Sequence, residues 1–279
     1  MKTLHSTSLT TRFLLTGLAL VGLATTAHAA GKTAPTATEG VYQSGGHPIR
    51  FTRFDSQETG LRPVVLLLHG LDGADANRNV YEALATTMTN NGYSVFFIRY
   101  FDSFASRPEE LAAFQASVKD ELFAPNSPKR DRIYRTFTIC LETVKDGLRH
   151  IRTQPGIDPK QMAVFGLSMG GFLGLAVATD AKSQVKVVVE FFGGLPREFH
   201  AKAGQLPPTL ILHGDKDRIV PVRAAHELAR LLETTKCPHD VCIYPGVDHV
   251  FTSEKGEIDW VTGFDGCLRA MTFLEKHLK

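Results

Sequence analysis

A serine flanked by glycines ends an apolar run in the second half of the chain. Residues 161–171 read Gln-Met-Ala-Val-Phe-Gly-Leu-Ser-Met-Gly-Gly, which places Ser168 at the centre of a G-x-S-x-G motif. A sharp turn from strand to helix needs glycine on both sides of the serine, because side chains there would clash with neighbouring strands. The turn would present the hydroxyl at a helix N-terminus, where free N–H groups favour a developing negative charge. We therefore predict that Ser168 is a catalytic nucleophile.

The nucleophile needs a base and an acid to activate it. A base must remove the hydroxyl proton, and a third group must hold that base in the right tautomer. In folds that carry this motif, the acid and then the histidine follow the serine in the chain. Asp217 follows the apolar run 210–212 and a glycine. We prefer it to Asp215 because the third residue after the glycine begins the next predicted helix and can point back over the sheet. The alternative role for Asp217 is the N-cap of that helix.

The base is expected in the loop after the last predicted strand. His249 follows the apolar run 241–244 and a Pro-Gly turn. Loops at the carboxyl ends of parallel strands share one edge of a sheet, so His249 would lie on the same rim as Ser168 and Asp217. His213, at the end of the strand that precedes Asp217, is the first alternative base.

The elements that must position these residues alternate between strand and helix. Apolar runs predict strands over residues 41–43, 49–54, 64–68, 93–98, 162–165, 185–192, 209–212 and 241–244, and helical spacing predicts helices over residues 77–91, 109–123, 131–153, 171–179, 222–235 and 265–279. This alternation predicts the α/β class, with a mostly parallel sheet of about eight strands and helices on both faces. The segment 102–130 is either a lid over the site or an insertion packed on the surface.

The N-terminus predicts an export signal. Two basic residues precede an apolar run over residues 13–26, and an A-x-A cleavage site ends at Ala29. We interpret residues 1–29 as a signal peptide and residues 30–279 as one domain. The apolar run is too short to span a bilayer, which disfavours an uncleaved membrane anchor. We therefore expect a periplasmic or secreted protein.

The charge balance disfavours a polyanionic partner. The sequence holds 31 Lys and Arg and 29 Asp and Glu, and cleavage removes two basic residues and no acid, which leaves 29 of each. No basic run is longer than Lys129-Arg130, so we expect no nucleic acid as partner. The expected partner is a small-molecule substrate, with no stable membrane anchor and with the protein a monomer or a small homo-oligomer.

The four cysteines suggest one disulfide. Cys237 and Cys242 flank the sequence Pro-His-Asp-Val, which suits a turn, and exported proteins retain disulfides. We expect this pair to be bridged. The alternative, one half of a metal site, would need two further ligands where only His239 is near, so we predict no metal. Cys140 and Cys267 lie in apolar helical patterns and are expected to be buried.

The three motifs are similar to those of the dienelactone hydrolase family. The similar segments are Gly-Leu-Ser-Met-Gly-Gly around Ser168, Leu-His-Gly-Asp-Lys-Asp ending at Asp217, and Tyr-Pro-Gly-Val-Asp-His-Val-Phe around His249. The resemblance spans roughly residues 40–279. It implies the α/β-hydrolase fold, this triad, and a small ester or lactone as substrate without a cofactor.

The resemblance also implies an oxyanion hole and sets limits on the substrate. The backbone N–H groups of Met169 and of Leu71, or of Gly70 in place of Leu71, would bind the oxyanion. The family's founding enzymes have a cysteine nucleophile, a glutamate in the loop after the third strand, and an arginine four residues past the catalytic histidine, where this chain has Ser253. The resemblance therefore favours a broader serine esterase over a true dienelactone hydrolase. A small peptidase on the same fold and a non-catalytic binding protein are the alternatives.

A few further residues are expected near the substrate. The pocket is predicted to be lined by His69, Gly70, Arg99, Tyr100 and Phe192. Arg99 could bind a substrate carboxylate or form a surface ion pair, and Phe192 could be part of the core. Glu190, in an otherwise apolar strand, is either a hydrogen-bonded acid near the pocket or an acid at a solvated strand end.

Overall fold

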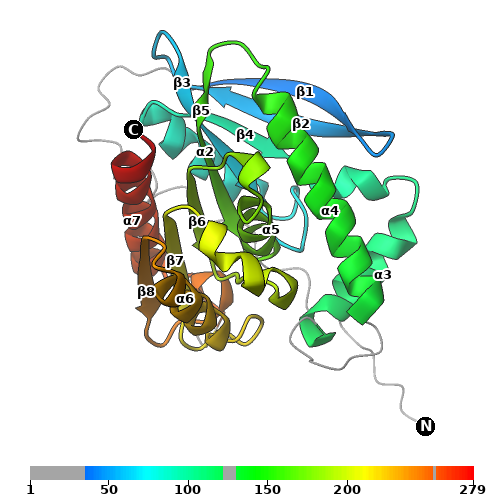
Figure 1. Ribbon diagram of the computed structural model, residues 1–279, viewed down its shortest axis with the longest axis vertical. Helices are drawn as coiled ribbons and strands as arrows, with labels where there is room; N and C mark the ends of the chain where they lie inside the picture. Colours follow the sequence, from blue (N-terminus) through cyan, green and yellow to red (C-terminus); the bar gives the residue numbers. More distant parts are fainter. Residues whose placement is uncertain (1–34, 122–129, 254–255) are drawn as a thin grey trace. The chain divides into compact units, whose positions relative to one another are not determined.

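An eight-stranded sheet lies at the centre of the fold (Figure 1). The computed structural model describes residues 35–121, 130–253 and 256–279, so the signal peptide predicted over residues 1–29 lies outside the described residues. The strand order is β1-β2-β4-β3-β5-β6-β7-β8. β1 pairs antiparallel with β2, and β2 pairs antiparallel with β4, whereas every other pair is parallel. The predicted α/β fold with a mostly parallel sheet is confirmed.

The strands and helices follow the predicted order. The strands are β1 (Thr36–Ser44), β2 (His47–Asp55), β3 (Arg62–Leu68), β4 (Ser94–Ile98), β5 (Ile157–Leu167), β6 (Val187–Phe191), β7 (Thr209–Gly214) and β8 (His239–Tyr244). The α-helices are α2 (Arg78–Asn90), α3 (Pro108–Glu121), α4 (Arg130–Ile151), α5 (Met169–Ala178), α6 (Arg223–Thr235) and α7 (Trp260–Leu278). Short 3₁₀ helices are η1 (Tyr100–Phe104), η2 (Ala181–Ser183), η3 (Arg197–Gln205) and η4 (His249–Phe251).

The edge strand β1 is longer than its sequence predicted. It begins at Thr36, whereas the apolar pattern predicted a strand from residue 41 only, because residues 36–40 carry few apolar side chains. The pairing with β2 is continuous from Thr36 opposite Asp55 to Ser44 opposite His47. An edge strand is held largely through its backbone hydrogen bonds, so a hydrophobic pattern does not reveal its full length.

The central strands are covered on both faces. In β3, Val64, Leu66 and Leu68 belong to one apolar cluster with α3, α4, α5 and α6, while Val65 and Leu67 belong to a second cluster with α2 and α7. Alternate residues of a strand point to opposite faces, which explains why this run is apolar throughout. None of the helices in the described part of the chain is long and apolar enough to cross a membrane.

Helix α3 packs on the body of the fold. It lies against α4 (Figure 1), and its Phe114 and Val118 side chains are buried in the same apolar cluster as α4. These contacts agree with the packed-insertion interpretation for this part of the segment 102–130. Residues 122–129 of that segment lie outside the described residues.

The predicted disulfide between Cys237 and Cys242 is wrong. All four cysteines lie in the described part of the chain and are free thiols. The sequence between this pair is not a turn, because β8 begins at His239. A strand rises about 3.3 Å per residue, so the Cα atoms of His239 and Cys242 are about 10 Å apart. Cys237 lies two residues before His239 and is too far from Cys242 to be bridged. The buried Cys237 thiol instead faces the Ala203 carbonyl at 3.6 Å.

Candidate active site

The turn around Ser168 joins β5 directly to α5. Ser168 is the N-cap of α5 and has φ 52° and ψ −116°, a left-handed backbone that disfavours any residue with a side chain. A Cβ atom at Gly166 would lie 2.2 Å from the Gly170 carbonyl oxygen, and one at Gly170 would lie 2.3 Å from the Leu68 carbonyl oxygen. The turn is therefore closed so tightly that only glycine fits on either side of the serine.

This close approach predicts the effect of Gly170→Ala. We expect the substitution to lower the melting temperature by roughly 10 °C, because the new methyl group would displace backbone atoms of β3. Gly263→Ala is the matched control, since Gly263 is helical and a Cβ atom there meets nothing within 4 Å. The control should melt a few degrees higher, as alanine favours a helix by about 1 kcal/mol over glycine. Calorimetry on both variants checks this, and a Gly170→Ala protein as stable as the wild type would contradict the described turn.

The structure brings the side chains of Ser168, Asp217 and His249 together. His249 Nδ1 lies 2.7 Å from Asp217 Oδ2, and His249 Nε2 lies 3.1 Å from Ser168 Oγ. A carboxylate can only accept, so Nδ1 donates its proton to Asp217. The Nε2 lone pair then faces the serine hydroxyl and can accept its proton. The three loops that carry these residues follow β5, β7 and β8, at the carboxyl edge of the sheet.

Asp217 is held as a carboxylate inside the protein. The backbone N–H groups of Ile219 and Val220 donate to Oδ1 at 2.8 and 2.7 Å. Burial raises the pKa of Asp217, but hydrogen bonds from His213 and His249 outweigh burial and hold that pKa well below its ordinary value. Asp217 does not cap α6, which begins at Arg223 after Val222. Its carboxylate caps the preceding turn and orients His249 at the same time.

The loop around His249 is fixed by an aspartate that the sequence analysis did not single out. Asp248 Oδ1 accepts the backbone N–H of His249 at 2.7 Å and that of Arg218 at 2.9 Å, and Asp248 also forms an ion pair with the Arg218 side chain. This contact ties the loop after β7 to the loop after β8. An aspartate directly before a helical turn is a typical N-cap, which was the available signal.

Left-handed backbone is concentrated at this site. Six residues other than glycine have positive φ in the described part of the chain, and four of them lie here: Ser168, Phe192, Val250 and Phe251. A β-branched residue such as Val250 is rarely found in this conformation. The Phe192 ring meets the His249 ring edge to face, with centroids 4.8 Å apart. His249 is therefore presented from a strained loop that packs against aromatic side chains.

The structure favours the backbone N–H groups of Met169 and Leu71 as the predicted oxyanion donors. Met169 is the first residue of α5, where backbone N–H groups have no partner within the helix. The N–H of Gly70 donates to the Tyr81 hydroxyl at 2.9 Å, which favours Leu71 over Gly70 as the second donor. Gln115 of α3 donates to the Leu71 carbonyl at 2.7 Å and so fixes this loop from the other side.

His69 and Tyr100 do not line a pocket, so this part of the prediction was wrong. Both are fully buried, and their rings stack with centroids 3.9 Å apart. The Tyr100 hydroxyl donates to the His69 carbonyl at 2.6 Å, and His69 Nδ1 donates to the Gly70 carbonyl at 2.8 Å. Burial lowers the pKa of His69 to about 4, so this imidazole is neutral. The two rings support the loop that carries Leu71 from beneath.

The remaining predicted pocket residues have separate positions. A Cβ atom on Gly70 would lie 3.6 Å from Ser168 Cβ, so this loop borders Ser168. Arg99 forms an ion pair with Asp75 at 2.7 Å, which agrees with the surface ion pair that was the alternative. Phe192 is buried beside His249. His213, the alternative base, is fully buried and contacts Asp217, whereas the histidine at hydrogen-bond distance from Ser168 is His249.

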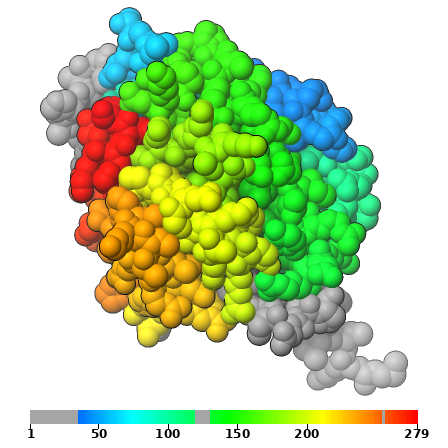
Figure 2. Space-filling model, in the orientation of Figure 1, coloured from blue at the N-terminus to red at the C-terminus, as the bar shows by residue number. Residues whose placement is uncertain are grey.

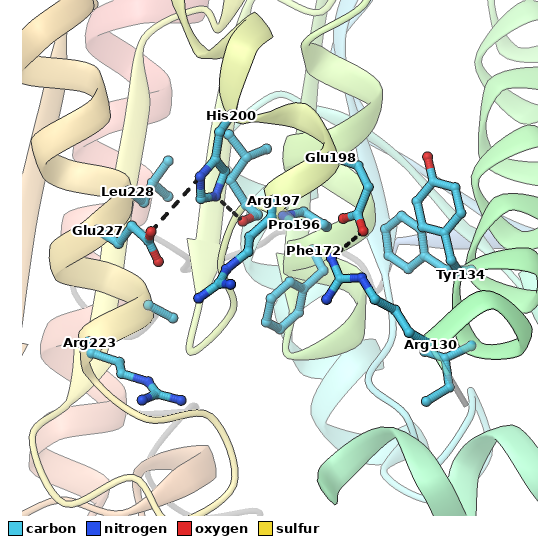
Figure 3. A pocket seen from close by; sticks show the side chains of 14 residues that line it. Arg130, Tyr134, Phe172, Pro196, Arg197, Glu198, His200, Arg223, Glu227 and Leu228 are labelled. Carbon is cyan, nitrogen blue, oxygen red and sulfur yellow. Dashed lines mark hydrogen bonds and ion pairs between the residues drawn. The ribbon is translucent and has the colours of Figure 1, made fainter. Parts of the chain in front are cut away.

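A pocket opens beside the first turn of α5 (Figure 3). Its lining combines apolar and charged side chains, among them Phe137, Phe172, Leu195, Leu228, Arg130, Arg197, Glu198, His200, Arg223 and Glu227. Figure 3 shows Phe172 between two pairs, Arg130 with Glu198 and His200 with Glu227. The Phe172 N–H donates to the Ser168 carbonyl at 3.2 Å, so the pocket lies one helical turn from Ser168. None of the three residues Ser168, Asp217 and His249 lines it.

The space-filling view shows which elements surround this region on one face. The yellow and orange segments of η3 and α6 lie next to the green surface of α4 (Figure 2). These are the elements that supply most of the lining of the pocket. Among the residues that the structure describes, no group of three or more His, Cys, Asp or Glu is placed to hold a metal ion.

The order of the sheet and the elbow between β5 and α5 define an α/β-hydrolase. A sequence profile of the dienelactone hydrolase family matches residues 53–275. The chain therefore belongs to the dienelactone hydrolase family, as the motifs predicted. This is a family of hydrolases.

Relatives and solved structures agree with this assignment. The chain is 21% identical over 197 residues to a protein of Aquifex aeolicus (strain VF5) that is provisionally named a carboxymethylenebutenolidase, covering 70% of this chain and 79% of that protein. The dienelactone hydrolase from Anabaena variabilis superposes with a TM-score of 0.64 at 16% identity, over 88% of this chain and 100% of that chain. The acylaminoacyl peptidase of Pyrococcus horikoshii gives a TM-score of 0.67 at 14% identity, over 92% of this chain and 44% of that chain.

Proposed function

We propose that the protein is a serine hydrolase that cleaves small carboxylic esters or lactones through an acyl-enzyme. The observation that carries this proposal is the chain of contacts from Asp217 through His249 to Ser168 at a strained elbow. Membership of a hydrolase family supports it. We further propose that the protein is exported after cleavage near Ala29, as the N-terminal sequence predicts.

Acylation follows from the arrangement of the three side chains. Ser168 Oγ attacks the carbonyl carbon of the ester while His249 Nε2 takes the hydroxyl proton. The negative charge on the carbonyl oxygen is stabilised by the N–H groups of Met169 and Leu71. The C–O bond to the alcohol then breaks, and the imidazolium gives its proton to the leaving oxygen. Asp217 stabilises this imidazolium without taking the proton itself.

Deacylation repeats the same chemistry with water. His249 Nε2 removes a proton from a water molecule as the water oxygen attacks the acyl carbon. The second oxyanion collapses, the bond to Ser168 Oγ breaks, and the imidazolium returns the proton to the serine. For a lactone the alcohol stays attached to the acyl group, so one product, a hydroxy acid, is released. Apart from the attacking water, the steps use only groups of the protein and the substrate.

The pocket beside α5 supports a preference for small substrates with an apolar part. Its apolar side chains, Phe172 and Leu195 among them, can pack against an acyl or alcohol group. Arg130, Arg197 and Arg223 contribute to the same lining, and arginine binds carboxylates well. We propose that this pocket accepts the group of the ester that lies away from the reacting carbon.

A peptidase is the second candidate, because a peptidase is among the structures with this fold. The chain spans 44% of that peptidase, so the likeness covers the shared hydrolase domain alone. The amine of an amide is a poorer leaving group than an alcohol or phenol with a low pKa. Esters and amides therefore separate the two candidates.

The test combines labelling with a substrate series. A fluorophosphonate should label one site, which peptide mass spectrometry should locate on Ser168. p-Nitrophenyl esters from acetate to octanoate, with and without a terminal carboxylate, should be hydrolysed, whereas aminoacyl anilides should not. Hydrolysis of the anilides alone would favour the peptidase, and an unlabelled protein that turns over neither class would reject catalysis by this serine. Prior heat denaturation supplies the control for non-specific labelling.

A further inference from the structure

A second acid and imidazole lie behind Asp217. Glu190 of β6 and His213 of β7 are both 0% exposed. In the sheet Glu190 lies opposite Ile211, so Glu190 and His213 point to the same face as diagonal neighbours on adjacent strands. Glutamate is almost never fully buried unless it is paired. A fully buried glutamate next to a fully buried histidine is therefore unusual, and the contacts of both side chains have to account for it.

Each of the two residues has one polar atom without a partner. Glu190 Oε2 accepts the Gly193 N–H at 2.7 Å, and His213 Nε2 lies 2.8 Å from the Val220 carbonyl. Glu190 Oε1 and His213 Nδ1 are buried and have no hydrogen-bond partner among the described residues. A buried polar atom without a partner is costly, and such atoms are commonly joined by a shared proton or a bound water.

The pair is connected to the proposed triad through Asp217. A carbonyl accepts, so His213 Nε2 carries a hydrogen, and this nitrogen also lies 3.4 Å from Asp217 Oδ2. The same oxygen accepts His249 Nδ1–H at 2.7 Å. Two imidazoles thus face one carboxylate oxygen, one from the interior and one from the site.

We propose that Glu190 and His213 are positioning residues that hold one exchangeable proton between Glu190 Oε1 and His213 Nδ1 through a bound water. With this proton the pair is neutral, and without it the pair carries one negative charge behind Asp217. That charge favours the imidazolium that forms on His249 during the reaction. The proposal rests on the proposed function for its effect on rate and on the buried pair alone for its effect on stability.

The electrostatics of the surrounding groups agree with this assignment. Burial raises the pKa of Glu190 to about 7, with His213 and the Gly193 N–H acting against burial and Asp217 acting with it. Burial lowers the pKa of His213, but Asp217 and Glu190 raise it above the ordinary value. The titratable groups that face the pair are therefore Asp217 and, beyond it, His249. The pair loses its proton in the neutral range.

The pH dependence of Glu190→Gln tests the proposal. At pH 5.5 Glu190 keeps its proton and carries no charge, as glutamine does, so kcat/KM of variant and wild type on a neutral ester should agree within about twofold. At pH 8.5 the variant lacks the charge, and we expect its kcat/KM to be about tenfold lower, the scale for one charge near a developing cation. Glu190→Asp should restore this pH-dependent part. Asp215→Asn, which removes a carboxylate bonded to the Gly246 N–H in the same loop, should show no such change.

Melting curves test the buried acid without reference to the reaction. A folded-state pKa raised from 4.5 to about 7 means that stability is lost as pH rises through this window, because the unfolded chain releases the proton first. The melting temperature of Glu190→Gln relative to wild type should therefore increase between pH 5 and pH 8. A ratio of kcat/KM that is constant with pH would overturn the role in catalysis.

A wild-type measurement covers the case in which the glutamine variant does not fold. A ¹³C NMR titration should show one glutamate carboxyl group that titrates near neutrality and that is absent from the Glu190→Asp spectrum. A Glu190 carboxyl group that titrates at its ordinary value would overturn the proposal as a whole. Absence of esterase activity in the wild type, with the shifted titration present, would reject the proposed function and retain the buried pair.

Discussion

Replacement of Ser168 by alanine should lower kcat for ester hydrolysis by about five to six orders of magnitude. The alanine cannot form the acyl-enzyme, and the remaining His249 and oxyanion donors could assist only a direct attack by water. Such residual catalysis is typically about 10³- to 10⁴-fold over the uncatalysed reaction. The fold should persist, because the Ser168 side chain lies on a turn and contributes no core packing. Single-turnover kinetics with a p-nitrophenyl ester measures the loss.

Ser183→Ala is the control for this substitution. Ser183 is buried in η2, beyond the far end of α5, and its hydroxyl accepts the Val185 N–H at 3.4 Å. Its replacement removes a serine hydroxyl without touching the loops at the carboxyl edge. We expect wild-type activity. A Ser168→Ala protein that retained more than about a tenth of the activity would place the nucleophile elsewhere.

Asp217→Asn should lower kcat by about four orders of magnitude at neutral pH. The asparagine side chain can turn its amide toward His249 Nδ1 and donate to it. The imidazole would then carry its proton on Nε2, where it can no longer accept the proton of Ser168. The turn should remain closed, because the amide oxygen can still accept the N–H groups of Ile219 and Val220. Steady-state kinetics from pH 6 to pH 9 shows the effect.

Asp215→Asn controls for the loss of a carboxylate from this loop. Asp215 Oδ1 accepts the Gly246 N–H at 2.7 Å, an interaction that the amide oxygen of asparagine preserves. Activity should stay within about twofold of wild type, since exposed or part-exposed charges contribute little. Equal losses in the two variants would show that charge in this loop, and not the orientation of His249, governs the rate.

The sheet was predictable because its central strands are buried on both faces. Val64 to Leu68 and residues 95–98 are apolar without alternation, the pattern expected of a strand that is covered on both faces. The positions of Ser168, Asp217 and His249 were predictable for a related reason, since each follows such a strand and the strand ends share an edge. In both cases a local pattern determines the position in the fold.

The errors concern features that depend on neighbouring elements. Residues 238–241 contain proline and polar residues that suit a turn, yet residues 239–241 pair with β7 as part of β8, and this separates Cys237 from Cys242. His69 and Tyr100 look like surface residues of a loop, but their stacked rings lie beneath it. The contact between Asp248 and Arg218 joins two loops 30 residues apart. A short stretch of sequence around one of these residues does not contain the residues that it contacts in the fold.

The left-handed residues around His249 set a limit on how this protein can be made more heat-resistant. Ser168, Phe192, Val250 and Phe251 each hold a backbone that costs roughly 1–3 kcal/mol, a sizeable share of a net stability of about 5–15 kcal/mol. Glycine at any of these positions would relax the backbone. A laboratory selection for heat resistance alone would therefore accumulate substitutions at these four positions. The resulting variants would be more stable but would lose activity. Each round would therefore also have to select for catalytic activity. Substitutions that raise thermal stability would have to be sought away from this site, in helices such as α7.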